Sequence, residues 1–512
     1  MKKLLYLLII FTLVISCQKE ENFMTEIPEY ENPSESKSIE EILTSKAVIG
    51  KKLPNPYSVD IMKQAFNNLK METKSGLSED CIEATHHYIV FKPSCHAHYR
   101  SLIMDEELDF YPYPLDHEVS DGWVVLDPDP EYSTNGYQHR WGYVPVEKDL
   151  SHIECPYEIL YDIYAPDEEV YTKSLISESL YEQLEQEAHA ICGMELIPIA
   201  ATKAEDVTPS GNITYQDSTE TYQRYIGCSG MSVRANRLTK KAYGHCDENG
   251  DFVCDDSFKY NWTYNVYFSR TDFEMRRDYS TEEFFLKFSG YHGPLNLRFD
   301  NDAPDSEYFD CVFYCEILRA ACKYYYGDIN GLNRPFLADE VNDRMYIQAV
   351  RGCHPTDNYV AGETGGNENY PQIKIFRETV RNGRLSSDLI YGFTIHELAH
   401  MAHAKAIGIV NWNNCQSLVR ESYAMGIEWF ISKNYYPNRI LNIGGYQTDI
   451  IKRLVEGDGV HATYSVIELE TALTSSNVLT WNQWRDNIIN YYSNRNEEDY
   501  VKEVFEDCYY SE

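Results

Sequence analysis

The segment from Thr394 to His400, with the sequence TIHELAH, constrains this chain more than any other stretch. An α-helix advances about 3.6 residues per turn, so His396 and His400 would project from one face, one turn apart. Two imidazoles placed in this way can bind one zinc ion, while Glu397 would lie beside a water molecule on that ion. The segment therefore predicts a helix that carries a metal site and its general base.

A carboxylate follows the motif at some distance. Glu421 opens the sequence ESYA on a second predicted helix, and twenty residues separate it from His400. An H-E-x-x-H motif followed by such a carboxylate resembles the gluzincins, the thermolysin-like clan of zinc peptidases. This resemblance implies that His396, His400 and Glu421 bind zinc and leave one position open, as in catalytic zinc sites. The metzincin pattern is excluded, because it needs glycine where His403 stands and histidine where Ala406 stands.

The implied ligands define roles for neighbouring side chains. Zinc would lower the pKa of its bound water toward ~7 and polarise the scissile carbonyl. Glu397 would take the water proton as general base and deliver it to the leaving amine. The resemblance also implies a Tyr or His that stabilises the oxyanion, for which His461, Tyr464 and Tyr446 are the candidates. The sequence does not choose among these three residues.

The sequence allows more than one role for two further residues near the motif. His403 is expected at the edge of the ligand face, where it would support the site or contact the substrate. Glu428 lies seven residues after Glu421 and shares its helix face. It would either orient a ligating imidazole through the free ring N–H or form a surface ion pair.

The strand before the zinc helix bears on substrate binding. In thermolysin-like peptidases an extended substrate pairs with an edge strand in this position, so residues 372–376 are the candidate edge strand. Residues 362–369 are rich in glycine and are expected to form a loop. The zinc helix itself is expected to begin at Ser386 or Ser387 and to end near Gly408.

The first residues of the chain indicate export. A basic start and an apolar run over residues 4–15 precede Cys17, which resembles a bacterial lipobox. Residues 18–21, Gln-Lys-Glu-Glu, resemble the surface-export tag of Bacteroidetes lipoproteins. We therefore expect a signal peptide over residues 1–17 and a lipid anchor on Cys17. The protein would then be an outer-membrane lipoprotein that is exposed at the cell surface.

The charge of the chain excludes one class of partner. Its 512 residues include 45 Lys and Arg against 81 Asp and Glu, a formal net charge of −36. Such a chain repels phosphate backbones, so no nucleic-acid partner is expected. Its hydrophobic content of 43% predicts folded domains.

The pattern of elements along the chain predicts a multidomain α+β protein. Near the N-terminus, residues 86–91 are expected to form a strand and residues 156–164 a helix. The histidines and cysteines between residues 81 and 98 lack metal-ligand spacing, so we expect them to be structural. The predicted parts are a signal peptide (1–17), a flexible tether (18–48), an N-terminal α+β module (49–202), a linker (203–221), a small β-sandwich (222–280) and a mainly helical, zincin-like metallopeptidase domain with a small sheet (281–512).

The sandwich assignment depends on the segment Cys246–Phe252, CDENGDF. It resembles the strand–turn–strand pattern of carboxypeptidase regulatory-like domains, which have a transthyretin-type sandwich. Cys246 and Cys254 flank the turn, so a cross-strand disulfide between them is possible. The cysteines of a predicted helix over residues 309–326 are instead expected to be buried free thiols.

These observations predict a cell-envelope zinc peptidase that cleaves extracellular proteins, peptides or glycoproteins. The alternative is a surface lipoprotein that binds peptides or glycans and holds zinc without catalysis. A zinc hydrolase that acts on another bond is a third possibility. The glutamate of the motif, Glu397, favours the enzyme, because a purely structural zinc site does not need this carboxylate.

Overall fold

The structure is a computed structural model in which the chain from Ser38 onward forms one compact unit. The predicted signal peptide, the Cys17 anchor and residues 18–37 of the predicted tether lie outside the described residues. The described residues are 38–69, 78–105, 107–125, 130–166, 176–194, 206–219, 224–280, 283–300, 310–341, 344–356, 361–367, 370–439, 446–475 and 478–510.

The N-terminal end of this unit is a short capped helix. α2 (Ile39–Leu43) begins at a capping box formed by Ser38 and Glu41, which satisfies two backbone N–H groups of its first turn. The indole of Trp123 donates a hydrogen bond of 2.7 Å to the last carbonyl of the helix. Residues 38–48, predicted as the end of a flexible tether, therefore belong to the folded unit.

A three-stranded antiparallel sheet with the order β7-β2-β8 follows. β2 (His86–Phe91) is the predicted strand and pairs with both of the others. β8 (Tyr157–Ile163) replaces the helix predicted over residues 156–164, because its tyrosines and isoleucines suit a strand that pairs with β2. The other elements here are β1 (Ile49–Lys52), α3 (Val59–Asn68), η1 (Glu79–Cys81), α4 (His96–Ile103), β3 (His117–Val119), β5 (Ser133–Thr134), β6 (Tyr137–Gln138), β7 (Arg140–Pro145) and α6 (Glu178–Ile191).

Two sheets pack together in the middle of the chain. One has the order β12-β11-β14-β16-β4, and the other has the order β10-β9-β13 with β17 paired to β9. The rings of Phe252 and Tyr264, one from each sheet, have centroids 6.0 Å apart. Strands from outside residues 222–280, the predicted sandwich, join both sheets. The strands are β4 (Gly122–Val125), β9 (Ser210–Asp217), β10 (Arg224–Gly227), β11 (Ser232–Arg237), β12 (Lys240–His245), β13 (Asp251–Val253), β14 (Trp262–Tyr267), β16 (Phe284–Tyr291) and β17 (Leu295–Phe299).

A four-stranded sheet with the order β15-β18-β20-β19 precedes the predicted zinc helix. β15 (Phe273–Arg277), β18 (Met345–Val350) and β20 (Tyr370–Phe376) run parallel. β19 (Gly362–Asn367) runs antiparallel to β20 and forms an edge. The prediction that residues 372–376 form the edge strand was wrong, because β20 has a neighbour on each side. Residues 362–367 of the glycine-rich segment, which was predicted as a loop, form the edge strand instead.

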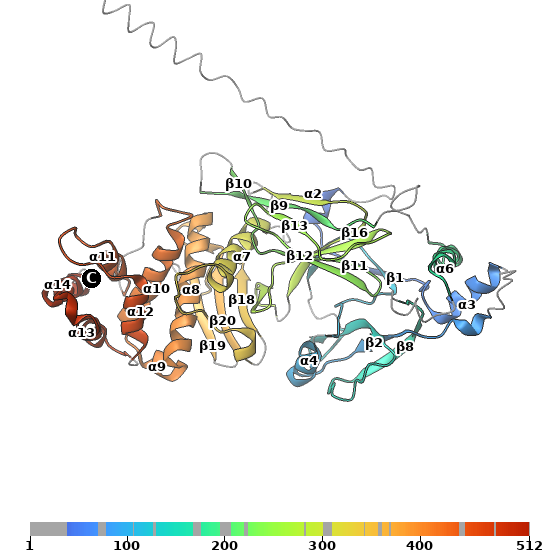
Figure 1. The fold of residues 1–512 in the computed structure, drawn as a ribbon, viewed down its shortest axis with the longest axis horizontal. Coiled ribbons are helices and arrows are strands. Elements are labelled where there is room, and N and C mark those ends of the chain that lie inside the picture. Colours follow the sequence, from blue (N-terminus) through green and yellow to red (C-terminus); the bar gives the residue numbers. More distant parts are fainter. Residues whose placement is uncertain are drawn as a thin grey trace, which may run out of the picture. The chain divides into compact units, whose positions relative to one another are not determined.

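Helices cover this sheet and complete the chain (Figure 1). α8 (Ser387–Ile407) begins after Ser386 and ends at Gly408, which has a φ of 82°. The predicted bounds of the zinc helix are thus confirmed. The remaining elements are α7 (Cys311–Tyr326), η2 (Ala338–Glu340), β21 (Glu378–Thr379), β22 (Gly383–Arg384), α9 (Ile409–Asn414), α10 (Ser417–Ser432), α11 (Ile450–Glu456), α12 (Val466–Thr474), α13 (Trp481–Tyr491), η3 (Ser493–Arg495) and α14 (Glu498–Tyr510).

One hydrophobic core extends from Ile42 in α2 to Cys508 in α14 and includes side chains of the middle sheets, α7, α8 and α10. The cysteines of α7 are buried free thiols, as predicted. Cys246 and Cys254 are also free thiols, and the sulfurs that approach most closely belong to Cys228 and Cys315, with Sγ atoms 3.2 Å apart. This mixture of helices and sheets agrees with the predicted α+β class.

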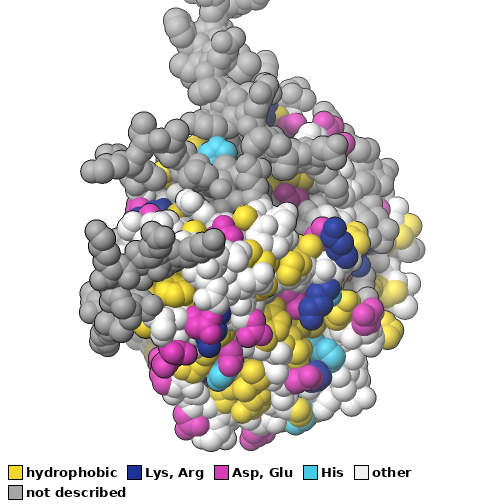
Figure 2. Space-filling view, turned by 90° about the vertical axis from the view of Figure 1, so that its right-hand side faces the viewer, with side chains coloured by type: hydrophobic (Ala, Val, Ile, Leu, Met, Phe, Trp, Pro, Cys, Tyr) yellow, Lys and Arg dark blue, Asp and Glu magenta, His cyan; other side chains and the backbone are white. Residues whose placement is uncertain are grey.

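One face of the described surface is mixed in charge. On the face drawn in Figure 2, acidic, basic and hydrophobic side chains are interspersed, and none of these kinds covers the face alone. Within the described part of the chain, no helix combines the length and the apolar character needed to cross a bilayer.

Candidate metal centre

The two histidines of the motif lie on one face of α8, as the helical repeat requires. Their ring centroids are 4.8 Å apart, and both side chains are buried. α8 packs against α7, α10 and the strands β19 and β20, so nearly all of its faces are covered. This burial explains why its sequence is apolar around the whole helix and not along one stripe.

Glu421 reaches the two histidines from α10. Its Oε2 lies 3.2 Å from Nε2 of His396 and 3.5 Å from Nε2 of His400. Four tetrahedral ligands held ~2.1 Å from a zinc ion would lie roughly 3.4 Å from one another. The three donor atoms therefore fit a single ion of this size. Among the described residues, these three side chains form the only group of metal-ligating atoms that lie this close together.

A buried ion pair contacts His396 at Nδ1, the ring nitrogen that does not face Glu421. Nδ1 of His396 lies 3.0 Å from Oε2 of Glu428, and Nε of Arg439 donates to Oε1 of Glu428 at 3.1 Å. Arg439 also donates to the backbone carbonyl of Asp388 in the first turn of α8. A carboxylate on the far nitrogen fixes the tautomer and the ring orientation of a metal ligand. Glu428 thus contacts the imidazole, and it is buried, which excludes the surface ion pair.

A helical glycine provides the space for this arginine. A Cβ added at Gly392 would collide with the Arg439 guanidinium. Glycine inside a helix costs roughly 1 kcal/mol relative to alanine, so its presence here has a packing reason.

Glu397 lies between α8 and the edge strand β19. Its Oε2 accepts a hydrogen bond of 2.5 Å from Oγ1 of Thr364. A Cβ added at Gly362 would stand 2.5 Å from Oε1 of the same carboxylate. The strand therefore touches both oxygens of Glu397: one is held by a hydroxyl, and the other has room only because residue 362 is glycine.

The electrostatics of the centre favour a cation. Burial alone would lower the pKa of His396, but hydrogen bonds to Glu421 and Glu428 raise it to about 10. Burial opposes ionisation of Glu421, yet the two imidazoles hold its pKa well below the ordinary range. Burial raises the pKa of Glu397, which suits a group that must accept a proton. A positive charge at the point shared by the donor atoms is therefore stabilised.

Other predicted residues lie away from the ligand atoms. His403 is fully buried against Tyr423, with ring centroids 5.0 Å apart, and neither of its ring nitrogens hydrogen-bonds to a described residue. Burial lowers its pKa to about 3. The expectation that His403 contacts the substrate is therefore not supported by its position, and a core residue is the better description.

The three oxyanion candidates differ in their surroundings. His461 stacks on Tyr500 at 4.3 Å and hydrogen-bonds to Asp458. Tyr464 is buried beside Arg495. Tyr446 is 59% exposed, and its backbone carbonyl accepts a hydrogen bond from Ser422, the neighbour of Glu421. None of these contacts brings a candidate ring or hydroxyl to the ligand atoms; Tyr446 is the one whose backbone meets α10.

Three contributors were not predicted. Arg439 lies in the turn after α10 and has no motif of its own, and Thr364 lies in the segment predicted as a loop. The ring of Trp412, on α9, lies 5.9 Å from the ring of His400, and the guanidinium of Arg420 lies 4.5 Å from the centroid of the Trp412 ring. No sequence spacing links these residues to the motif; only the tertiary packing brings them there.

Comparison with known proteins adds no assignment. No protein-family model matches the chain, and a search of curated proteins finds no match.

Proposed function

We propose that this protein is a zinc-dependent peptidase of the cell envelope that hydrolyses peptide bonds in extracellular proteins, peptides or glycoproteins. The observation that supports it best is a set of two histidines and one glutamate beside a carboxylate held by an edge strand. His396, His400 and Glu421 would hold the ion. When bound, zinc would activate a water molecule and polarise the scissile carbonyl.

Glu397 is the proposed general base. One of its oxygens is engaged by Thr364, which leaves the other, Oε1, to take a proton from the attacking water. The same carboxyl group can then release that proton to the leaving amine. Its raised pKa brings it closer to the range in which both transfers proceed at neutral pH.

The edge strand β19 is the proposed binding site for the substrate backbone. Its outer side has no partner strand among the described residues, so an extended peptide can pair with it. Because β19 also touches Glu397, a peptide paired here would pass the general base. Tyr446 is the candidate that would donate to the oxyanion.

The location remains a proposal that the leader sequence supports. A lipidated Cys17 would anchor the chain in the outer membrane, and the acidic residues after it favour export to the surface. The substrates would then be proteins or glycoproteins outside the cell.

The test uses the soluble chain from residue 18 onward, its zinc content and a diverse peptide library. We expect one zinc per chain, and cleavage that falls by roughly 10²–10⁴-fold in Glu397→Gln while zinc is retained. His396→Ala should lose the zinc. Glu456→Gln, an exposed change at the end of α11, is the matched control and should keep both properties.

Two results would contradict the proposal. Zinc at one per chain without any cleavage that depends on Glu397 would favour the alternative, a surface lipoprotein that binds peptides or glycans. Zinc retained in Glu421→Ala with unchanged affinity would remove Glu421 from the ligand set.

A further inference from the structure

A second concave site lies outside the metal centre. A cavity of about 780 Å³ opens between β10, the loop after it and the C-terminal half of α7. This volume lies within the range of small-ligand pockets, and none of the proposed zinc ligands lines it. Its most informative lining residues are Arg270, Arg319, Lys323, Tyr225, Tyr326 and Tyr435.

The cavity is cationic in a chain that is strongly acidic. It is lined by Arg224 together with Arg270, Arg319 and Lys323, against the two acids Glu248 and Asp328, which are both exposed. The chain as a whole has 45 basic residues for 81 acidic ones. A concave surface that reverses this ratio focuses a positive potential on its interior and attracts anions.

Two of these cations have no carboxylate partner among the described residues. Arg270 donates to the backbone carbonyl of Gly230 at 2.9 Å and lies over the Tyr326 ring at 4.8 Å. The ammonium group of Lys323, half-buried one turn before the end of α7, makes no hydrogen bond or ion pair with the described part of the protein. Half-buried charges without an opposite charge beside them are costly, so their grouping around one cavity indicates a ligand that carries the opposite charge.

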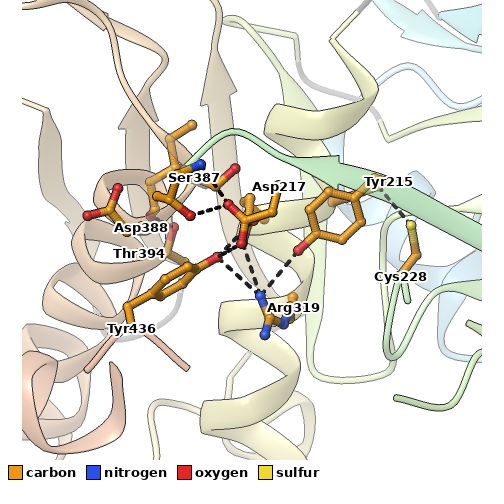
Figure 3. Close-up of polar contacts among 12 residues, drawn as sticks. Tyr215, Asp217, Cys228, Arg319, Ser387, Asp388, Thr394 and Tyr436 are labelled. Carbon is orange, nitrogen blue, oxygen red and sulfur yellow. Dashed lines mark hydrogen bonds and ion pairs between the residues drawn. The ribbon is translucent and has the colours of Figure 1, made fainter. Parts of the chain in front are cut away.

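The third cation, Arg319, is rigidly held at the cavity wall. Its Nη1 hydrogen-bonds to the hydroxyls of Tyr215 and Tyr436, at 3.4 and 3.2 Å, as Figure 3 shows. Its guanidinium also lies 4.4 Å from the ring centroid of Tyr435. These two hydrogen bonds use Nη1, which also lies 3.7 Å from Oε2 of the buried Glu316, and they leave Nε and Nη2 unused. A fixed guanidinium fork matches the geometry of a carboxylate.

The other lining side chains suit a sugar. Tyr326 is 41% exposed, and Tyr225 and Tyr435 are half-buried, so three tyrosine side chains line the cavity, each with a guanidinium beside its ring. Tyrosine provides an apolar ring for the C–H face of a pyranose and a hydroxyl for hydrogen bonding. Thr214, Ser229 and Asn249 add polar groups, whereas Ile226 is the one aliphatic residue that the cavity lining includes. An acidic peptide would gain little from such a surface beyond its charge.

We propose that this cavity binds an acidic oligosaccharide, whose carboxylates contact Arg270, Arg319 and Lys323 and whose rings pack on the tyrosines. The site is separate from the proposed zinc centre and does not depend on peptidase activity. It would let the protein hold a glycan, or the glycan of a glycoprotein.

The experiment measures binding by calorimetry with the soluble chain from residue 18 onward carrying Glu397→Gln, so that no cleavage interferes. The probes are tetragalacturonate, its methyl ester and tetraglutamate. We expect tetragalacturonate to bind, to weaken at least tenfold in Lys323→Gln or Arg270→Gln, and to weaken when salt rises from 20 to 500 mM. The neutral methyl ester should bind at least tenfold more weakly.

Lys452→Gln is the matched control, because Lys452 on α11 is half-buried, makes no ion pair with described residues and lies outside the cavity lining. Its affinity for tetragalacturonate should equal that of the parent. No binding of tetragalacturonate, or equal loss in Lys452→Gln, would overturn the proposed site. Tetraglutamate binding as tightly as the sugar would overturn the glycan assignment and indicate an acidic-peptide site. Failure of the peptidase test leaves these outcomes unchanged.

Discussion

A single arginine outside α8 and α10 determines how His396 is held. Arg439 neutralises Glu428, which is buried and hydrogen-bonded to the far nitrogen of the imidazole. Arg439→Met would leave this carboxylate buried without a countercharge. We expect a loss of about 3–5 kcal/mol in the free energy of unfolding and roughly 10–100-fold weaker zinc binding. Urea denaturation and competition with a chromophoric chelator measure the two effects.

The control for this arginine is Arg298→Met. Arg298 lies 3.7 Å from Asp300, and its side chain is 63% exposed. An exposed pair contributes at most about 1 kcal/mol, so this variant should remain close to the parent in both measurements. Equal losses in the two variants would show that Arg439 has no special role.

A buried acid predicts a dependence of stability on pH. Burial raises the pKa of Glu316 to about 7, whereas an unfolded glutamate titrates near ~4.3. The folded state therefore favours the protonated form. The stability from this group is complete below pH ~4 and is lost as the pH rises through ~7, by about 4 kcal/mol.

Glu316→Gln should remove this loss. The amide can still accept the 3.0 Å hydrogen bond from Tyr436 but cannot ionise. We expect urea denaturation between pH 4 and 8 to give a flatter stability profile than in the parent, while the exposed change Glu456→Gln keeps the parent profile. A profile in Glu316→Gln as steep as that of the parent would refute the assignment.

At the residue scale, the sequence predicted what helix geometry alone determines. The spacing of His396 and His400 was sufficient to expect two imidazoles on one face. Glu421 was expected beside them only because its segment resembles the second zinc helix of gluzincins, and the three donor atoms do lie together. Arg439 and Thr364 were not predictable, because their contacts depend on how separate segments meet. The role of Glu428 was left open for the same reason. Its burial, and not its spacing, decides between orienting an imidazole and forming a surface ion pair.

At the scale of elements, the edge strand β19 would link substrate binding to the proposed general base, Glu397. Gly362→Ala would place a methyl group 2.5 Å from Oε1 of Glu397 and force the carboxylate to move. A displacement of about 1 Å in a catalytic group can cost roughly 10²-fold in rate. We expect this loss in kcat with little change in zinc affinity, measured by steady-state kinetics and metal titration.

The same strand supplies the matched control. A Cβ at Gly365 would meet no atom within 4 Å, so Gly365→Ala makes the same chemical change in open space. Its activity should stay within about twofold of the parent. If both variants lose activity equally, the contact with Glu397 is not what makes Gly362 necessary.

The contrast between α8 and β19 shows which elements a sequence can define. The sequence itself contains the signals that start and end α8, a serine at the N-cap position and Gly408 after the last turn. Both predicted ends were confirmed. The edge position of a strand depends on which strands pair with it. The order of the strands is a property of the whole sheet. Glycine weakens a strand, so the glycines of β19 predicted a loop where the structure has a strand.

At the scale of the whole molecule, the predicted division into parts does not follow the sheets. The larger middle sheet includes β4 from the predicted N-terminal module and β16 from the predicted catalytic domain. Changes of composition along the chain marked the boundaries, but strand exchange between distant segments leaves no compositional signal. One continuous core from Ile42 to Cys508 results, whereas β2 and the helices α3 and α6 contribute to a separate cluster.

The continuous core predicts which elements zinc binding should protect from amide exchange. Zinc at a thousandfold excess over its Kd should stabilise the folded state by about 4 kcal/mol and slow amide exchange through unfolding by roughly 10³-fold. Because β14 and β16 share their core with α8 and α10, we expect slowing in all four elements. β2, whose Tyr88 and Val90 belong to the other cluster, should change little. Hydrogen exchange followed by mass spectrometry in mild denaturant measures this, with His396→Ala as the control that zinc does not protect. Slowing of exchange confined to α8 and α10 would mean that parts of the core unfold independently. The candidate metal centre and the middle sheets would then be stabilised separately.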